Sequence, residues 1–143
     1  MKATGIVRRI DDLGRVVVPK EIRRTLRIRE GDPLEIFTDR DHVVAVAGNG
    51  KKEFDGKPLS KQMEGIIENR ADFVANKDDD SFVKITLDDT GEQCSQAVAT
   101  IICQGDAIGA VVISDKNEKR QMGDTEHKLA ITAAGFLGRQ MEQ

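Results

Sequence analysis

The side chains best suited to chemistry in this sequence are arginines, and they are concentrated at its N-terminal end. Residues 1–29 contain nine basic side chains, seven of them arginine, against three acidic ones, a net charge of about +6. Residues 30–143 contain the other 13 basic and 22 acidic side chains, about −9. A basic head on an acidic body indicates a polyanionic partner for the head alone. A guanidinium group can hold a phosphate or a guanine edge with two hydrogen bonds. The alternative interpretation is a solvated charged face.

Short strands are expected to position these arginines. Residues 5–10 and 15–18 are β-branched runs, and the Asp and Gly residues at 11–14 supply the turn between them. Residues 33–38 are expected to form a further strand, closed by a charged turn at 39–41.

A short helix is expected between these strands. Pro19 suits its first turn, where a missing N–H costs nothing, and the helix ends near Gly31. Ile22 and Leu26 are spaced i, i+4 and are predicted to face a core. The helix also carries a basic stripe at helical spacing, formed by Lys20, Arg23, Arg24 and Arg27.

The basic segment is too small to fold alone. About forty residues bury too little apolar area to offset an ordering entropy of roughly 1.5 kcal/mol per residue. Its first strand is also apolar on both faces, since Ile6 and Ile10 share a face with Arg8, and Val7 shares a face with Arg9. We therefore predict an interleaved homodimer in which each chain completes the core of the other.

From residue 42 onward the pattern predicts a second domain of the α+β class. Its helices are amphipathic, and the last is expected to be capped by Asp124 and to end near Met141. A hairpin signal at 104–106 joins two of its strands. The expected elements are a strand at 42–47, a helix at 59–70, a half-buried strand at 82–87, strands at 96–103 and 107–114, and the closing helix.

The two cysteines raise an enzymatic alternative. Cys94 and Cys103 could serve as the nucleophile and resolving thiol of a reductase. If residues 94–103 form one strand, however, a spacing of nine places the two thiols on opposite faces and far apart. Buried cysteine acting as a small apolar side chain is the commoner case, and two cysteines are too few for a disulfide scaffold.

No metal or cofactor site is predicted. His42 and His127 lack a second ligand at zinc spacing. The acidic run 78–80 lacks the glycine and terminal glutamate of a calcium loop, and residues 48–52 lack the rest of a phosphate-binding loop. Solvated turns are the commoner explanation for both segments.

We expect the chain to lie in the cytoplasm and to bind double-stranded DNA. No apolar run approaches the roughly 18 residues of a membrane span, and the first residues lack the apolar core of a signal peptide. The chain has no Trp or Tyr, so it lacks an aromatic stacking platform for single strands.

The first forty residues resemble the AbrB-like swapped-hairpin DNA-binding family. The resemblance is carried by TGIVRRIDDLGRVVVPKEIRRTLRI at residues 4–28 and by GDPLEI at 31–36. It implies that residues 1–41 of two chains interleave into one all-β dimeric barrel with one short helix per chain. It also implies that DNA is contacted by Arg8, Arg15, Arg23 and Arg24, with Arg9 as an accessory.

Residues 42–143 look like a GAF-type domain, an antiparallel sheet flanked by helices, most clearly at 105–113, 122–128 and 133–143. The two resemblances together imply a transcriptional regulator of late, forespore sporulation genes that activates, represses or does both as a homodimer or homotetramer. In such a regulator the GAF domain senses a small molecule of unidentified chemistry. The alternatives are a GAF domain used only for oligomerisation and a cysteine-dependent methionine sulfoxide reductase.

One departure from the family pattern lies at residues 40–42. In the family, the strand that ends near Asp41 is followed by its hairpin partner, a linking helix, and the N-terminal helix and first strand of the GAF domain. Here Asp41 runs directly into residues 42–47, which resemble an interior GAF strand. The sequence therefore looks shortened at residues 40–42, and a real deletion there would remove one strand from the barrel and one face from the GAF domain.

Overall fold

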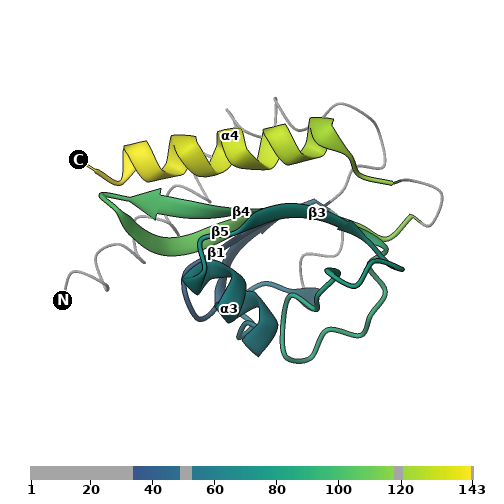
Figure 1. The fold of residues 1–143 in the computed structure, drawn as a ribbon. Coiled ribbons are helices and arrows are strands. Elements are labelled where there is room, and N and C mark those ends of the chain that lie inside the picture. The colour runs from purple at the N-terminus through teal and green to yellow at the C-terminus, as the bar shows by residue number, and fades with distance from the viewer. Residues whose placement is uncertain (1–33, 49–52, 118–120, 143) are drawn as a thin grey trace.

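Five antiparallel strands and two helices form the part of the chain that the structure, a computed structural model, describes: residues 34–48, 53–117 and 121–142. The strands make one sheet in the order β2-β1-β5-β4-β3, with a helix on each face (Figure 1). In chain order the elements are β1 (Leu34–Thr38), β2 (Val43–Ala47), α3 (Lys61–Glu68), β3 (Asp72–Asn76), β4 (Ser95–Cys103), β5 (Asp106–Asp115) and α4 (Asp124–Gln140).

The hairpin of β4 and β5 is the centre of the sheet. Its turn consists of Gln104 and Gly105, which have φ values of 51° and 86°. Two successive positive φ angles give a turn whose twist matches that of the flanking strands, which is why a glycine is favoured there. The predicted strands at 96–103 and 107–114 and the hairpin between them are confirmed.

One face of the sheet is covered by α4, as Figure 1 shows. Alternate residues of β4 face this helix, and the helix contributes Ala130, Ala133 and Leu137 to the same core. Gly138 permits the close approach, because a Cβ there would lie 2.1 Å from the carbonyl oxygen of Ile102. The predicted closing helix is confirmed, but its cap differs: Gly123 is the cap residue, and its N–H donates to Glu126 Oε1 at 2.8 Å.

The opposite face is covered by the shorter helix α3 and by irregular chain. Ser60 caps α3 by accepting a hydrogen bond from the Met63 N–H at 3.0 Å, which satisfies one of the helix's free donors. Met63 and Ile67 are the buried residues of α3, and they pack in a core that also contains Phe54 and Ile85. The predicted helix at 59–70 is confirmed, with shorter ends.

The segment 82–87 is not a strand, contrary to its alternating pattern. The backbone of Val83 is bound instead by a side chain: Gln96 Nε2 donates to the Val83 carbonyl, and the Val83 N–H donates to Gln96 Oε1, both at 3.0 Å. Only an isolated bridge, between Leu59 and Thr86, involves this segment. The fifth strand of the sheet is β3, which the sequence pattern did not predict.

The strand predicted at 33–38 forms, but in a different place from the one expected. The boundary predicted after Asp41 assigns this strand to the N-terminal domain. In the structure β1 lies between β2 and β5 and pairs antiparallel with both. Leu34 and Ile36 face the core under α3, and Phe37 faces the core under α4, so both faces of β1 are used. Among the described residues, the first strand of the sheet is therefore β1.

Neither of the two helices among the described residues is long and apolar enough to cross a membrane.

Candidate functional site

The five arginines predicted to bind DNA, Arg8, Arg9, Arg15, Arg23 and Arg24, lie outside the described residues, as do the first two predicted strands of the barrel and its helix. The structure describes the sheet that follows the basic segment in the sequence, and its first strand is β1 (Leu34–Thr38).

Strand β1 is held firmly by its neighbours in the sheet. All five residues of β1 are buried, and they pair with five residues of β5, from Leu34 opposite Ser114 to Thr38 opposite Ala110. The Ala110 N–H donates to Thr38 Oγ1 at 3.1 Å. A Cβ on Gly109 would lie 1.8 Å from the Thr38 carbonyl oxygen, so this pairing requires glycine at position 109.

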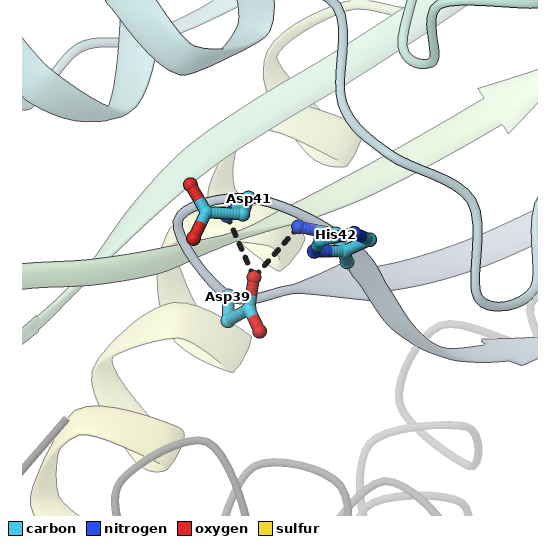
Figure 2. A group of neighbouring side chains, drawn as sticks. All are labelled: Asp39, Asp41 and His42. Carbon is cyan, nitrogen blue, oxygen red and sulfur yellow. Dashed lines mark hydrogen bonds between the residues drawn. The ribbon is translucent and has the colours of Figure 1, made fainter. Parts of the chain in front are cut away.

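The turn between β1 and β2 brings together three side chains with metal-ligand chemistry. Ligand-type atoms of Asp39, Asp41 and His42 lie within 4.8 Å of one another. Asp39 Oδ1 accepts hydrogen bonds from the N–H groups of Asp41 and His42, both at 2.7 Å (Figure 2). The Asp41 carboxylate points away from Asp39 in the same view. The geometry is that of a side chain closing a turn. The sequence has no second zinc ligand at the usual spacing from His42. The two aspartates lie close to His42 because the chain turns here.

The face under α3 is where the sheet carries buried polar side chains among apolar ones. Gln96 is fully buried there with its bonds to Val83, and the Ser114 hydroxyl donates to Gln93 Oε1 at 2.6 Å. Each of these groups is therefore engaged within the chain. The rest of this core consists of apolar side chains, among them Phe54, Leu59 and Met63.

The two cysteines lie at opposite ends of β4. Cys103 is its last residue, and Cys94 precedes its first; both are buried, and they are not joined to each other. Nine residues of extended chain separate their Cα atoms by about 30 Å. The Cys94 thiol donates to the carbonyl oxygens of Glu92 and Lys116, at 3.6 and 3.5 Å. The expectation that the two thiols cannot pair is confirmed.

The remaining charged candidates are surface features. His127 Nε2 lies 2.7 Å from Asp72 Oδ1, which ties the first turn of α4 to the start of β3. In the acidic run, Asp79 Oδ2 accepts the Asn76 N–H at 2.8 Å, so this segment is a turn.

One exposed ion pair, between Lys57 and Asp88, lowers the pKa of its carboxyl group. Lys57 Nζ lies 3.2 Å from Asp88 Oδ2, and the Thr86 hydroxyl donates to the other carboxylate oxygen. The hydrogen bond from Lys57, reinforced by the one from Thr86, holds the pKa of Asp88 below its ordinary value of 3.8.

Comparison with protein families matches residues 24–142 to "Stage V sporulation protein T C-terminal, transcription factor". The chain is 43% identical, over 182 aligned positions that cover 100% of both chains, to stage V sporulation protein T of Bacillus subtilis (strain 168). Since the chain has 143 residues, 39 of the 182 positions fall opposite gaps in it. A 44-residue stretch, 31% of the chain, is 59% identical to the transition state regulatory protein AbrB of the same organism and covers 46% of that protein.

Solved structures with the same fold include several GAF domains. The GAF domain of A. aeolicus nlh2 aligns with a TM-score of 0.61 and 14% identity, covering 99% of this chain and 96% of that one. A type II free methionine-R-sulfoxide reductase from Thermoplasma acidophilum aligns with a TM-score of 0.62 and 12% identity, covering 91% and 93%. At such identities the likeness establishes the fold alone. The chain therefore belongs to the stage V sporulation protein T family of transcription factors, with an AbrB-like N-terminal region and a GAF-like C-terminal fold.

Proposed function

We propose that this chain is a DNA-binding regulator of late, forespore sporulation genes, which activates promoters, represses them or does both. The observation that carries the proposal is the 43% identity to stage V sporulation protein T across the full length of both chains. The AbrB-like match over 44 residues supports the same function for the basic segment. As a regulator of bacterial promoters the chain acts in the cytoplasm.

The DNA contacts are proposed to be Arg8, Arg9, Arg15, Arg23 and Arg24. The support is electrostatic: residues 1–29 concentrate nine of the chain's 22 basic side chains against three acidic ones. Contacts to phosphate supply affinity, and one or two bidentate contacts to guanine supply sequence preference. Two copies of the segment are required because one copy buries too little apolar surface, so the active species is a homodimer or a homotetramer.

The GAF-like domain is proposed to tune DNA binding by changing how the paired basic segments are spaced when a small molecule binds. One observation favours a second function for this domain, that of an oligomerisation block. Its core under α3 is packed with apolar side chains, and the buried Gln96 there is already bound to Val83. A panel of candidate metabolites distinguishes the two, since a sensor shows a shift in DNA affinity or melting temperature that a block does not.

The chain is proposed to have no enzymatic role. The methionine sulfoxide reductase alternative needs two cooperating thiols, and Cys94 and Cys103 lie at opposite ends of β4. Titration of the free thiols before and after peroxide treatment tests this point, because a catalytic pair loses both thiols to one intramolecular disulfide.

The decisive experiment measures binding to a promoter-length duplex across a salt series. Neutralising about six phosphates gives a slope of roughly −5 in a plot of log affinity against log salt concentration, because each contact contributes about −0.9. The Arg23→Ala/Arg24→Ala variant should bind more weakly, and its slope should be flatter by about one for each phosphate that it no longer neutralises.

The matched control is Lys61→Ala/Lys84→Ala, which removes the same charge from two exposed side chains of the GAF-like domain. This control should retain the slope and nearly all of the affinity. Weak binding by the wild-type chain that does not depend on salt would refute the proposed function.

A further inference from the structure

The strand β1 (Leu34–Thr38) is included in two different sequence relationships. The motif of the DNA-binding segment runs through residue 36, and the AbrB-like match of 44 residues is longer than the 33 residues that precede β1. That match therefore cannot end before the strand. The transcription-factor family match, which covers residues 24–142, contains the same strand. The same strand therefore falls within the sequence of the DNA-binding segment and within the GAF-like sheet.

Within the sheet, β1 is an interior strand with an unusual polar content. It pairs with β5 on one side and with β2 on the other, so removing it would divide the sheet. Yet Glu35 is only 3% exposed, and Asp39, which follows the strand, is 7% exposed. Asp39 Oδ1 accepts two backbone N–H groups, and Glu35 also has a partner within the chain, so the strand is stably paired.

The β1–β2 hairpin is also closed by its own residues. Asp39 Oδ1 accepts the N–H groups of Asp41 and His42, and the Asp39 N–H donates to the His42 carbonyl at 3.0 Å (Figure 2). These bonds involve no residue of β5. A hairpin with an independent turn can separate from β5 and remain a hairpin.

We propose that β1 is a shared strand: when it is paired with β5 it is withheld from the N-terminal segment, and DNA binding requires its release from the GAF-like sheet. The inference rests on the proposed function, because it concerns DNA binding by that segment. It makes the β1–β5 pairing an autoinhibitory contact. Apparent affinity for DNA then scales with the fraction of molecules in which β1 is free.

A disulfide between β1 and β5 tests the proposal in the full-length chain. Ile36 and Val112 are directly opposite each other in the register, so Ile36→Cys/Val112→Cys joins the strands when oxidised. Cys94→Ala and Cys103→Ala are included so that only the new pair reacts. Binding to a mixed-sequence duplex is measured with the same sample oxidised by diamide and then reduced. We expect oxidation to weaken binding by about tenfold or more and reduction to restore it.

A glycine variant tests the opposite direction. In Gly109→Ala the added Cβ would lie 1.8 Å from the Thr38 carbonyl oxygen if nothing moved. The two strands must therefore shift apart, which weakens the β1–β5 pairing. It should bind DNA several-fold more tightly than the wild type. The control is Gly65→Ala, whose added methyl group meets nothing within 4 Å and which should leave DNA binding unchanged.

The outcomes separate the two proposals. Equal DNA affinity of the oxidised and reduced forms, at the level of the wild type, overturns the shared strand and leaves the proposed function intact. Failure of the wild type to bind any duplex overturns both. Weaker binding in the oxidised form together with tighter binding by Gly109→Ala supports the shared strand even if either variant is less stable.

Discussion

The two faces of the sheet are covered in different ways. On one face a single helix of 17 residues, α4, packs small and apolar side chains against β4 and β5. On the other face a helix of eight residues, α3, is joined by irregular chain that is held by hydrogen bonds from side chains to backbone. Gln96 binds Val83, the Ser60 hydroxyl donates to the Lys84 carbonyl at 2.6 Å, and the Ile85 N–H donates to Asp89 Oδ2 at 3.1 Å.

Close packing and buried polar groups therefore specify the structure of the two faces by separate means. The α4 face depends on shape, because a helix and a strand approach until backbone atoms limit the contact. The α3 face depends on satisfying particular donors and acceptors, because irregular chain over a sheet has backbone groups that no neighbouring strand can bind. Substitutions that alter shape should therefore be most damaging on the first face, and substitutions that remove polar partners on the second.

The largest effect is expected at the closest contact of the α4 face. Gly138→Val places a branched side chain where even a Cβ would be 2.1 Å from the Ile102 carbonyl oxygen. The helix must move away from β4, and we expect a loss of about 3 kcal/mol or more in the free energy of unfolding. Chemical denaturation followed by circular dichroism measures it.

The matched control for Gly138 lies three residues earlier in α4. A Cβ on Gly135 meets only Arg139 Nη1, at 3.5 Å, which is an ordinary contact. Gly135→Ala should therefore stabilise the chain by about 0.5–1 kcal/mol, since alanine favours the helix over glycine. Destabilisation of both variants to the same degree would show that the contact with Ile102 is not the cause.

A smaller effect is expected from a polar side chain of the α3 face. Gln96→Leu keeps the approximate volume of the side chain but leaves the N–H and carbonyl of Val83 without their partner. Leaving buried polar groups unsatisfied should cost about 2–3 kcal/mol and should increase amide hydrogen exchange at Val83. The control Gln62→Leu, at an exposed position of α3, should change stability by less than about 0.5 kcal/mol. Unchanged exchange at Val83 in Gln96→Leu would contradict the polar account of this face.

The smallest effect is expected at the exposed edge of the α3 cover. The hydrogen bond from Lys57 is the main cause that keeps the pKa of Asp88 below 3.8, so the ionised carboxylate is favoured in the folded chain. Because the pKa of Asp88 is lowered on folding, its ionised carboxylate contributes to folding stability above about pH 3.8. That contribution disappears as the pH falls through the folded-state pKa. Lys57→Met should raise the pKa of Asp88, as measured by NMR titration of the carboxyl carbon. A pKa that stays where it was would exclude Lys57 as the cause.

The same difference explains which parts of the fold could be predicted from the sequence. The closing helix and the β4–β5 hairpin were predicted because apolar residues recur at regular spacing and Gly105 marks the turn. The segment 82–87 alternates like a strand, but Gln96 and Asp89, which bind its backbone, are distant or irregularly placed in the sequence. No periodic pattern records such bonds. The strand β3 was missed because its polar ends, Asp72 and Asn76, give it little apolar alternation.

The site was predicted less completely than the fold. The DNA-binding arginines remain predictions, because they lie outside the described residues. The position of β1 could not be predicted, because a buried strand of residues such as Leu34, Ile36 and Phe37 fits either domain equally well by its pattern. Its pairing with β5 is decided by Gly109, 71 residues beyond Thr38, which alone leaves room for the Thr38 carbonyl.

The distance along the chain between β1 and β5 has a consequence for synthesis on the ribosome. Thr38 and Ala110, which are joined across these strands, are separated by 72 positions. The basic segment and the β1–β2 hairpin are therefore both made well before β5 exists. Under the shared-strand proposal, the hairpin is available during that interval only to the segment that precedes it, and it pairs with β5 only after β5 has emerged. On that proposal, slowing translation after residue 47 would lengthen the period in which only the N-terminal segment can pair with the hairpin.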